Sequence, residues 1–276
     1  MTNHHAATHL KTVIVTGGAG GGIGGGISTV LAEAGWNTVI VDIDRDAGRS
    51  LSEQLNRRGL SAAFLEADVT HPGCAEQAVA FAASKFAGPC ALVNSAGIGL
   101  VKDIAEVSDE DYRRVFSVNI DAPYRFSRAV VRAMPPSGGA IVNIGSVHAS
   151  ATCPGYTVYA ATKGAIDSFT RALAADCGPR AIRVNCIHPG LVPSPQNRDL
   201  IGRFAPSVDA WLAAYTLQKQ LLANLPSPRQ VGELVRFFLS DAASAITGQS
   251  VTIDGGTSAM LYERLMTTST IGDRNG

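Results

Sequence analysis

The sequence predicts a single α/β domain in which helices cover both faces of a doubly wound parallel sheet of about seven strands. Short apolar runs of strand length alternate with segments whose apolar residues recur about every 3.6 residues. The chain has 276 residues, a length at which one such domain is common. Ligands of these sheets bind beyond the carboxyl ends of the strands, so functional motifs are expected there.

The strands are expected at the apolar runs, which cover residues 12–16, 38–42, 62–67, 91–94, 140–144, 182–187 and 250–253. The helices are expected at the segments with helical spacing, which cover residues 27–34, 47–58, 75–86, 109–134, 159–177 and 231–239. Because a helical segment separates most successive strands, the strands are expected to run parallel.

One long connection interrupts this alternation. Residues 191–228 hold five prolines around an amphipathic piece at residues 208–222. A long insertion at the carboxyl end of a strand is typical of a lid over a substrate site. A surface excursion or a subunit contact is the alternative. We interpret the segment as a substrate loop.

Composition excludes several classes of partner. Lys plus Arg equals Asp plus Glu at 23 each, so no net positive field favours nucleic acid or an anionic membrane. The five cysteines are scattered without metal-ligand spacing, so we expect no metal site and a reducing, cytoplasmic setting.

The two terminal segments are expected to lie outside the domain. Residues 1–10 are expected to form a polar leader. Residues 257–276 are expected to form a tail that either packs on a neighbouring subunit or is disordered.

A glycine-rich turn follows the first strand directly. It runs from Gly17 through Gly22, Ile23 and Gly24 into the first helix. Glycines let the backbone approach a pyrophosphate closely, and the free N–H groups of the helix favour its negative charge. Strand, turn and helix in this order indicate a dinucleotide site of the Rossmann type.

Asp42 ends the second strand, eighteen residues beyond Gly24, which is about the spacing at which a carboxylate binds the adenosine ribose hydroxyls. The same carboxylate repels a 2′-phosphate, so NAD is favoured over NADP. Arg45 is the nearby cation that would reverse this preference. As alternatives, Asp42 caps the helix that begins near Asp46, and Asp68 caps the turn at residues 70–73.

Tyr159 and Lys163 stand four residues apart on an expected helix, so both project from one face. A tyrosine normally titrates near pH ~10, and a cation close to the phenol favours the phenolate that an acid/base needs. Ser146 follows the strand at residues 140–144, where its hydroxyl could bind the oxygen of a substrate. A serine in an ordinary turn is the alternative.

These motifs occur in the order and approximate spacing of a known family. The glycine turn, Asn94-Ser-Ala-Gly97, Asn119, Ser146, Tyr159-x-x-x-Lys163 and Pro189-Gly190 resemble the classical form of the short-chain dehydrogenase/reductase family. The likeness covers roughly residues 11–256, which we interpret as the dinucleotide-binding catalytic domain.

The resemblance implies a role for each matching residue. Tyr159 is the acid/base, Lys163 supports it and holds the nicotinamide ribose, Ser146 orients the substrate oxygen, and Asn119 supports a water relay; on sequence alone Asn119 could be an ordinary polar helix residue. The implied cofactor contacts, besides Tyr159 and Lys163, are Gly17, Gly22, Ile23, Gly24, Asp42, Ile43, Asp68, Val69, Asn94, Ala96, Gly97, Pro189, Gly190, Val192 and Ser194. The resemblance also suggests hydride transfer to the pro-S face and a homotetramer or homodimer.

Two positions depart from the family pattern. The glycine turn holds one residue more than usual, which leaves open whether Gly20, Gly21 or Gly22 faces the pyrophosphate. Ser95 stands where a second asparagine is usual, a change that keeps the backbone donors. Neither departure is expected to abolish binding.

His148 and Cys153 lie where family members shape the substrate pocket, although an ordinary surface-loop histidine is an equal reading of His148. We therefore expect an NAD-dependent oxidoreductase that acts on a secondary alcohol or its ketone. The alternatives are an NADPH-dependent carbonyl reductase and a dinucleotide-binding protein without turnover. Sugars, polyols, steroids, hydroxy acids and terpenoid alcohols all remain open as substrates.

Overall fold

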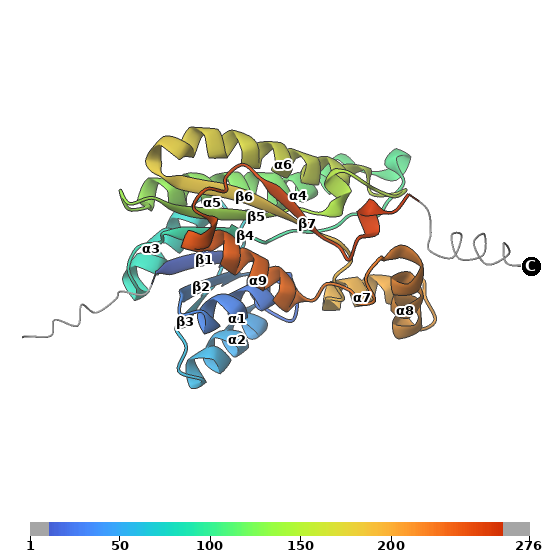
Figure 1. Cartoon of the computed structure of the whole chain (residues 1–276), viewed down its shortest axis with the longest axis horizontal. Coiled ribbons are helices and arrows are strands. Elements are labelled where there is room, and N and C mark those ends of the chain that lie inside the picture. The colour runs from blue at the N-terminus through green and yellow to red at the C-terminus, as the bar shows by residue number, and fades with distance from the viewer. Residues whose placement is uncertain (1–10, 262–276) are drawn as a thin grey trace, which may run out of the picture.

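The computed structural model describes residues 11–261 and shows one parallel sheet of seven strands. The strand order is β3-β2-β1-β4-β5-β6-β7, which confirms the Rossmann-type α/β fold that the sequence predicts (Figure 1). The leader at residues 1–10 and most of the tail at residues 257–276 lie outside the described residues. Each strand pairs with its neighbour in parallel register.

The strands match the apolar runs closely, and they are β1 (Thr12–Thr16), β2 (Asn37–Asp42), β3 (Ala62–Glu66), β4 (Ala91–Asn94), β5 (Gly139–Ile144), β6 (Ile182–Pro189) and β7 (Ser250–Ile253). The strand order reverses between β1 and β4, because β2 and β3 lie on one side of β1 and the later strands on the other. A crevice beyond the carboxyl ends of β1 and β4 is where ligands bind in such sheets.

Helices cover both faces of the sheet (Figure 1). One face carries α1 (Ile23–Glu33), α2 (Arg45–Arg57) and α9 (Pro228–Leu239). The other carries α3 (Cys74–Lys85), α4 (Asp109–Phe116), α5 (Ala122–Ala133) and α6 (Thr157–Cys177). Two further helices, α7 (Pro195–Gly202) and α8 (Val208–Lys219), lie together at one end of the molecule. They make up most of the expected substrate loop.

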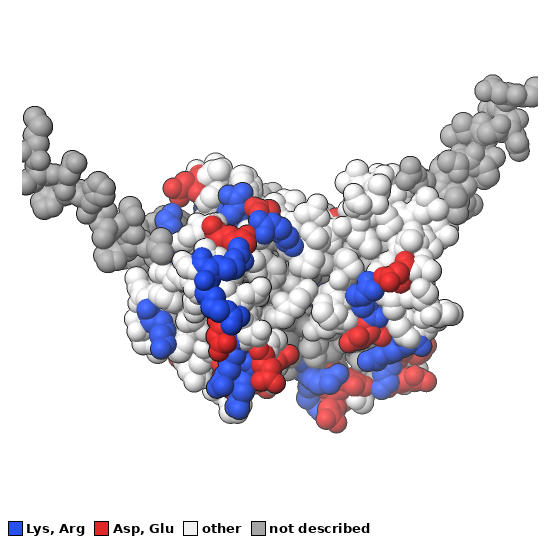
Figure 2. All heavy atoms as spheres, turned by 90° about the horizontal axis from the view of Figure 1, so that it is seen from below, with Lys and Arg blue, Asp and Glu red and all other residues white. Residues whose placement is uncertain are grey.

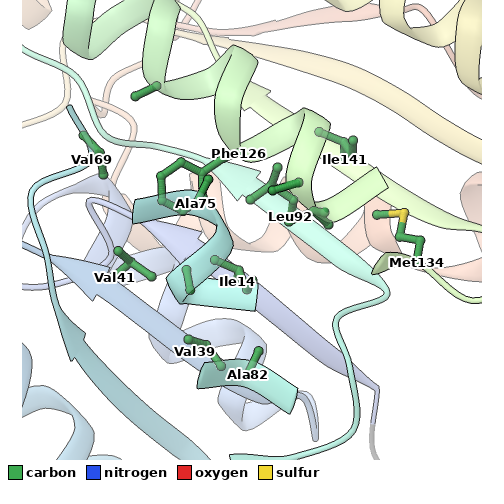
Figure 3. Close-up of a cluster of buried hydrophobic side chains, with 14 of the residues drawn as sticks. Ile14, Val39, Val41, Val69, Ala75, Ala82, Leu92, Phe126, Met134 and Ile141 are labelled. Atoms are coloured by element: carbon green, nitrogen blue, oxygen red, sulfur yellow. The ribbon is translucent and has the colours of Figure 1, made fainter. Parts of the chain in front are cut away.

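The core divides into layers because side chains alternate between the two faces of each strand. Ile14, Leu92 and Ile141 are fully buried and pack with Phe126 of α5 (Figure 3). Their neighbours in sequence, such as Val15 of β1, point to the opposite face and pack against α1 and α9. The central strands β1, β4 and β5 are therefore buried on both sides, as strands of a parallel sheet usually are, whereas most of the edge strand β7 is exposed.

The helix expected at residues 109–134 is interrupted in the structure. A π-helical segment, Ser117–Asp121, separates α4 from α5. Pro123 follows this segment and cannot donate a backbone hydrogen bond, which favours a widened turn there. Asn119 lies inside the π segment, so the irregular backbone carries an expected site residue.

Two helices differ from the expectation. α1 begins at Ile23 rather than at residue 27, because the glycines at positions 24–26 are helical although they have a low helix propensity. The helix α7 was not expected at all. Its start does carry a capping signal, since the side chain of Ser194 accepts a hydrogen bond from the backbone of Asn197 and Pro195 takes the first helical position.

α1 and α9 pack closely, although most of the described residues lie between them in the sequence. A Cβ atom at Gly26 would lie 2.6 Å from the carbonyl carbon of Pro228, and one at Gly232 would lie 3.0 Å from the carbonyl oxygen of Gly26. Glu33 at the end of α1 pairs with Arg229 of α9 at 2.8 Å and with Arg58 at 2.6 Å. Glycines and ion pairs thus join the two helices.

Basic and acidic side chains are interleaved on the face that Figure 2 shows. Ion pairs also occur among the described residues, for example between Arg198 and Asp209 at 2.6 Å. This face therefore presents no broad area of one charge sign, in agreement with the composition. Within residues 11–261, no helix combines the length and the hydrophobicity that crossing a membrane requires.

Candidate active site

The glycine turn folds tightly onto the ends of β1 and β4. Gly17 has a φ of +60°, and a Cβ there would lie 2.6 Å from the Cα atom of Ala96. A Cβ at Gly24 would lie 1.8 Å from the carbonyl oxygen of Gly17. Gly20, with a φ of +70°, lies in the turn that accommodates the additional residue. At Gly17 and Gly24 the chain can follow this path only with glycine, and at Gly20 the positive φ favours it.

The N-terminus of α1 opens onto this turn. Its N-cap is Gly22, which has no side chain to bond the first N–H groups of the helix. A Cβ at Gly21 would lie 3.5 Å from Pro195, and a Cβ at Gly22 would lie 4.0 Å from the Cβ atom of Ser194. The glycine turn therefore faces the loop that follows β6. Unpaired N–H groups at a helix N-terminus are suited to binding phosphate.

Asp42 accepts two backbone hydrogen bonds at the end of β2, from the N–H groups of Ala19 and Asp44, each at 3.0 Å. It does not cap α2, because that role belongs to the side chain of Asp44, which accepts the N–H of Ala47. The capping alternative for Asp42 is therefore wrong. The next residue, Ile43, is 69% exposed beside the turn.

Arg45 is paired rather than directed at Asp42. Its guanidinium donates two hydrogen bonds to Glu66, at 2.6 and 2.9 Å. The hydrogen bonds raise the pKa of Arg45 and lower the pKa of Glu66. The cation that could have bound a 2′-phosphate is therefore bound to the end of β3.

The capping alternative for Asp68 is confirmed. One carboxylate oxygen accepts both the N–H and the hydroxyl of Thr70 at 2.8 Å. Val69 is 9% exposed and packs into the core beneath this turn. A contact between Asp68 and an adenine would have to use the other carboxylate oxygen.

Asn94 joins the sheet to α5. Its amide donates to Asn143 at 2.8 Å and to Ser127 at 3.1 Å, and all three side chains are buried. The amide oxygen of Asn94 and the hydroxyl of Ser95 are buried without a hydrogen-bond partner among the described residues. Buried polar atoms normally have a partner, so a bound molecule with polar groups would complement this place.

The backbone beyond Asn94 is held by the end of β1. The hydroxyl of Thr16 accepts the N–H groups of Ser95 and Ala96, at 3.1 and 3.3 Å. A Cβ at Gly97 would lie 3.6 Å from the ammonium nitrogen of Lys163. The fourth-strand motif thus runs from the glycine turn toward the expected catalytic residues.

Lys163 is buried, with 5% of its surface exposed. Its ammonium donates one hydrogen bond to the carbonyl of Ile144 at 3.0 Å and lies 5.5 Å from the centre of the Tyr159 ring. An ammonium has three N–H donors, so further donors can serve a bound ribose or a phenolate. The structure thus brings Tyr159 and Lys163 together, as their helical spacing predicts.

Asn119 is fixed from several sides and is 1% exposed. Its amide oxygen accepts the N–H of Ile98 at 2.9 Å, and its amide nitrogen donates to the carbonyl of Ile98 at 3.0 Å and to Thr162 at 3.1 Å. Thr162 donates in turn to the carbonyl of Tyr159 at 2.7 Å. The side chain therefore joins the π segment to the first turns of α6.

Ser146 lies at the end of β5 and is 7% exposed. Its hydroxyl oxygen accepts the N–H of His148 at 3.2 Å, so its own hydrogen can be donated to another group. Its backbone N–H donates to the ring nitrogen Nδ1 of His188 at 3.0 Å. Sequence reasoning did not find His188, which stands directly before the Pro189–Gly190 pair.

An aromatic group stands beside Tyr159. His148 stacks on Tyr156 with ring centres 4.4 Å apart and meets Tyr159 edge-on at 5.5 Å. Nδ1 of His148 lies 2.8 Å from the hydroxyl of Thr152, and burial lowers the pKa of its ring. Cys153 is exposed nearby. Tyr156 was not predicted from the sequence, although three aromatic rings lie within residues 148–159.

The loop after β6 is equally constrained. The N–H of Gly190 donates to Ile253 at 2.9 Å, and a Cβ at Gly190 would lie 2.6 Å from the Cβ atom of Asp254. Val192 is fully buried, and Ser194 is 6% exposed at the start of α7. Together with Pro189 at the end of β6, these residues form one wall opposite the glycine turn.

A nicotinamide dinucleotide fits these residues. In the glycine turn, a Cβ atom at Gly17 or Gly24 would clash with the neighbouring backbone. The N-terminus of α1 at Gly22 has no side-chain cap, and the buried hydroxyl of Ser95 has no hydrogen-bond partner among the described residues. These features provide close backbone approach, N–H donors for a pyrophosphate and polar groups along one crevice.

Comparisons with known proteins agree with this site. A family model described as Enoyl-(Acyl carrier protein) reductase matches residues 18–258. The chain is 35% identical to cyclopentanol dehydrogenase of Comamonas testosteroni over 250 residues, which cover 90% of this chain and 97% of the relative. It is 34% identical to 3-alpha-(or 20-beta)-hydroxysteroid dehydrogenase of Mycobacterium tuberculosis over 255 residues, which cover 91% of this chain and 90% of the relative.

A solved structure is also similar. A short-chain dehydrogenase/reductase variant from Serratia marcescens matches with a TM-score of 0.81 and 29% sequence identity, covering 90% of this chain and 98% of that one. Family membership implies an NAD(P) cofactor. From the fold, the family match and these relatives, the chain belongs to the short-chain dehydrogenase/reductase family of nucleotide-binding oxidoreductases and acts on CH–OH groups.

Proposed function

We propose that this protein is an NAD-dependent dehydrogenase that oxidises a secondary alcohol to its ketone, with Tyr159 as the acid/base. The observation that carries the proposal is the buried ammonium of Lys163, 5.5 Å from the centre of the Tyr159 ring. A charge held in a dry place next to a phenol favours the phenolate. We therefore assign acid/base catalysis to Tyr159, with Lys163 as the cation that supports it.

The proton of the substrate hydroxyl passes to the phenolate of Tyr159. The hydroxyl hydrogen of Ser146 is donated to the substrate oxygen, because its own oxygen already accepts the N–H of His148. Lys163 stabilises the phenolate before the transfer. NAD, when bound, would supply the acceptor for the hydride that leaves the carbinol carbon.

The cofactor would lie along the crevice between the glycine turn and the loop after β6. The N-terminus of α1 at Gly22 would bind the pyrophosphate, and Lys163 would bind the nicotinamide ribose. Asn119 supports this arrangement by fixing Ile98 and Thr162 beside the site. A water relay from Lys163 past Asn119 to solvent would return the proton, as the family resemblance suggests.

NAD is preferred to NADP because of Asp42. Its carboxylate stands at the end of β2, where it would bind the ribose hydroxyls and repel a 2′-phosphate. Arg45, which could have reversed the preference, is bound by Glu66 at 2.6 Å. The reverse reaction with NADPH is thereby disfavoured.

We further propose a carbinol on an aliphatic ring as the substrate class. The relatives named above act, by their names, on cyclopentanol and on hydroxysteroids. The rings of Tyr156 and His148 present a largely apolar surface beside Tyr159, and burial lowers the pKa of His148, which disfavours its charged form. Residues 191–228 serve as the lid, with α7 and α8 as its helices.

The association of subunits and the compartment are parts of the same proposal. We expect a homotetramer or a homodimer, which light scattering on the purified protein would measure. All five cysteines are free thiols, which fits a cytoplasmic protein. His148 and Cys153 remain the proposed substrate-side residues.

The decisive experiment compares cofactors and alcohols together. Purified protein is incubated with NAD or NADP and with a panel of cyclopentanol, cyclohexanol, a 3-hydroxysteroid and linear 2-alkanols, and absorbance of the reduced cofactor is followed. Turnover with NAD and a ring alcohol would support the proposal. Turnover only in the direction of ketone reduction with NADPH would overturn it, and binding of NADH without any turnover would indicate a non-catalytic protein.

A further inference from the structure

His188 lies behind the strand end that carries Ser146. Its side chain is 9% exposed, and its Nδ1 accepts the backbone N–H of Ser146 at 3.0 Å. Its Nε2 lies 3.1 Å from a carboxylate oxygen of Asp167 on α6. Because Nδ1 accepts a hydrogen bond, the ring hydrogen of the neutral imidazole is on Nε2, which donates it to Asp167.

The backbone before Ser146 is shaped around this ring. A Cβ at Gly145 would lie 2.3 Å from Nδ1 of His188, so only glycine leaves room for the imidazole. The N–H of Gly145 also donates to the carbonyl of Ile187 at 2.7 Å. The end of β5 is thus held against β6 on both sides of Gly145, and Ser146 follows in an extended conformation.

Asp167 is itself held in place. It accepts the hydroxyl of Ser250 on β7 and forms an ion pair with Arg171 one turn later on α6. Burial raises the pKa of Asp167, but hydrogen bonds from Ser250, Arg171 and His188 outweigh it and lower the pKa to about 2. The carboxylate is therefore charged near neutral pH and fixes the orientation of the imidazole.

We propose that His188 is a positioning residue for the reaction: oriented by Asp167, its ring holds the main chain of Ser146 and thereby aims the Ser146 hydroxyl at the substrate oxygen. The inference rests on the proposed function, since it takes the Ser146 hydroxyl as the group that binds this oxygen. It extends the site from α6 through β6 to the end of β5.

The same residues do not favour a metal ion. Donor atoms of Asp167, Cys186 and His188 lie within 4.8 Å of one another, which is close enough for metal ligation. Both ring nitrogens of His188 are already in hydrogen bonds, however, and burial raises the pKa of the Cys186 thiol to about 12. A metal needs a thiolate, so the hydrogen-bonded arrangement is the better account of this cluster.

Two substitutions of His188 separate its two hydrogen bonds. The amide oxygen of His188→Asn can take the place of Nδ1 and accept the Ser146 N–H, whereas His188→Gln places its amide near Nε2 and keeps only the link to Asp167. We expect His188→Asn to retain most of kcat and His188→Gln to lose about 10- to 100-fold. Equal losses in both variants, or none, would overturn the proposal.

A double-mutant cycle tests whether His188 acts through Ser146. With the alcohol found above, His188→Gln should cost little in a Ser146→Ala background, because the hydroxyl that it positions is already absent. A loss of the same size in both backgrounds would show that His188 acts by another route. Arg113→Gln is the control, since it removes an exposed ion pair on another helix, with Asp109 of α4, and leaves Asp167 and His188 untouched.

Hydrogen exchange gives a readout that does not depend on turnover. We expect the backbone N–H of Ser146 to exchange faster in His188→Gln than in the wild type and His188→Asn. Unchanged exchange would refute the role of His188 and leave the proposed function intact. Failure of the wild type to oxidise any alcohol would refute the proposed function, whereas the exchange result would still test the contact between His188 and Ser146. Should His188→Gln not fold, Asp167→Asn takes its place, because an amide at position 167 favours the hydrogen on Nδ1 and so removes the acceptor.

Discussion

Tyr159 and Lys163 occupy one turn of α6 but differ in their surroundings. The ammonium of Lys163 is buried and bonded to the carbonyl of Ile144 at 3.0 Å, whereas the Tyr159 ring lies beside the rings of His148 and Tyr156. The lysine is thus fixed by the protein, and the phenol borders the place where a substrate would enter. This division of roles is what an acid/base supported by a cation requires.

Replacing the phenol should remove proton transfer and little else. We expect Tyr159→Phe to lower kcat/KM by about 10²- to 10⁴-fold, the range usual for a general acid/base, while NADH binding stays near the wild-type value. Steady-state kinetics and fluorescence titration of NADH measure the two quantities. Tyr112→Phe, at a residue that is 47% exposed, is the control. Full activity in Tyr159→Phe would refute the mechanism.

Asp42 is the residue on which the choice of cofactor depends. Removing its carboxylate would delete charge-assisted hydrogen bonds to the ribose, so Asp42→Ala should weaken NADH binding by about 10- to 100-fold. NADPH binding should weaken less or improve, because the repulsion of the 2′-phosphate is also lost. Titration with both cofactors measures the ratio, with Asp46→Ala as the control. An unchanged ratio would show that another group selects the cofactor.

At the scale of elements, the strands could be predicted more fully than the helices. β1 and β4 match the apolar runs residue for residue, because a buried parallel strand needs a continuous apolar stretch. The edge strand β7 also matches its run, although most of its residues are exposed. The helices depend on local features that weaken the pattern. The start of α1 was not predicted because glycines at positions 24–26 have a low helix propensity. The π-helical segment around Asn119 divides a stretch whose apolar pattern is continuous.

The site could be predicted only where its contacts join residues that are close in the sequence. Tyr159 and Lys163 lie one turn apart, so their contact follows from helical geometry. His188 meets Ser146 and Asp167 only because β5, β6 and α6 pack together, and no spacing in the sequence encodes that contact. Asn94, which was expected to line the cofactor, has its amide nitrogen bonded to Asn143 and Ser127, and its amide oxygen has no partner among the described residues.

Gly24 tests the link between α1 and the phosphate turn. A helix normally gains about 1 kcal/mol when alanine replaces glycine. Gly24→Ala should instead destabilise the protein and abolish NADH binding, because its Cβ would lie 1.8 Å from the carbonyl oxygen of Gly17. Thermal unfolding and NADH titration measure both effects.

The matched control is Gly164→Ala in α6, where a Cβ would have no neighbour within 4 Å. Here the usual gain in stability is expected, with unchanged NADH binding. Tight NADH binding by Gly24→Ala would mean that the glycine turn can relax around a side chain, contrary to the proposed close fit between this turn and the pyrophosphate.

At the scale of the whole molecule, acid should destabilise the fold through specific carboxylates. The hydrogen bond from Lys102, followed by the bond from the backbone of Ser108, lowers the pKa of Asp111 to about 2 from an ordinary 3.8. A carboxyl whose pKa is lower in the folded state stabilises the fold above its unfolded pKa. This contribution is therefore lost as the pH falls from about 4 to about 2.

The variant Asp111→Asn should remove that part of the pH dependence. Its urea unfolding midpoint should be lower than that of the wild type near pH ~6 and should approach the wild-type value as the pH falls toward ~3. Denaturation curves at several pH values give the comparison, with the exposed Asp199→Asn as the control. A constant difference at all pH values would assign the effect to packing instead.

The contact between α1 and α9 affects how the newly synthesised chain folds. A ribosome releases α1 long before Pro228 and Gly232, which cover Gly26 and Val30. Until then the apolar face that β1 and α1 present to α9 has no native cover. The nascent chain therefore cannot complete its first βα unit on its own, and we expect that face to be the part of the newborn protein that chaperones shield.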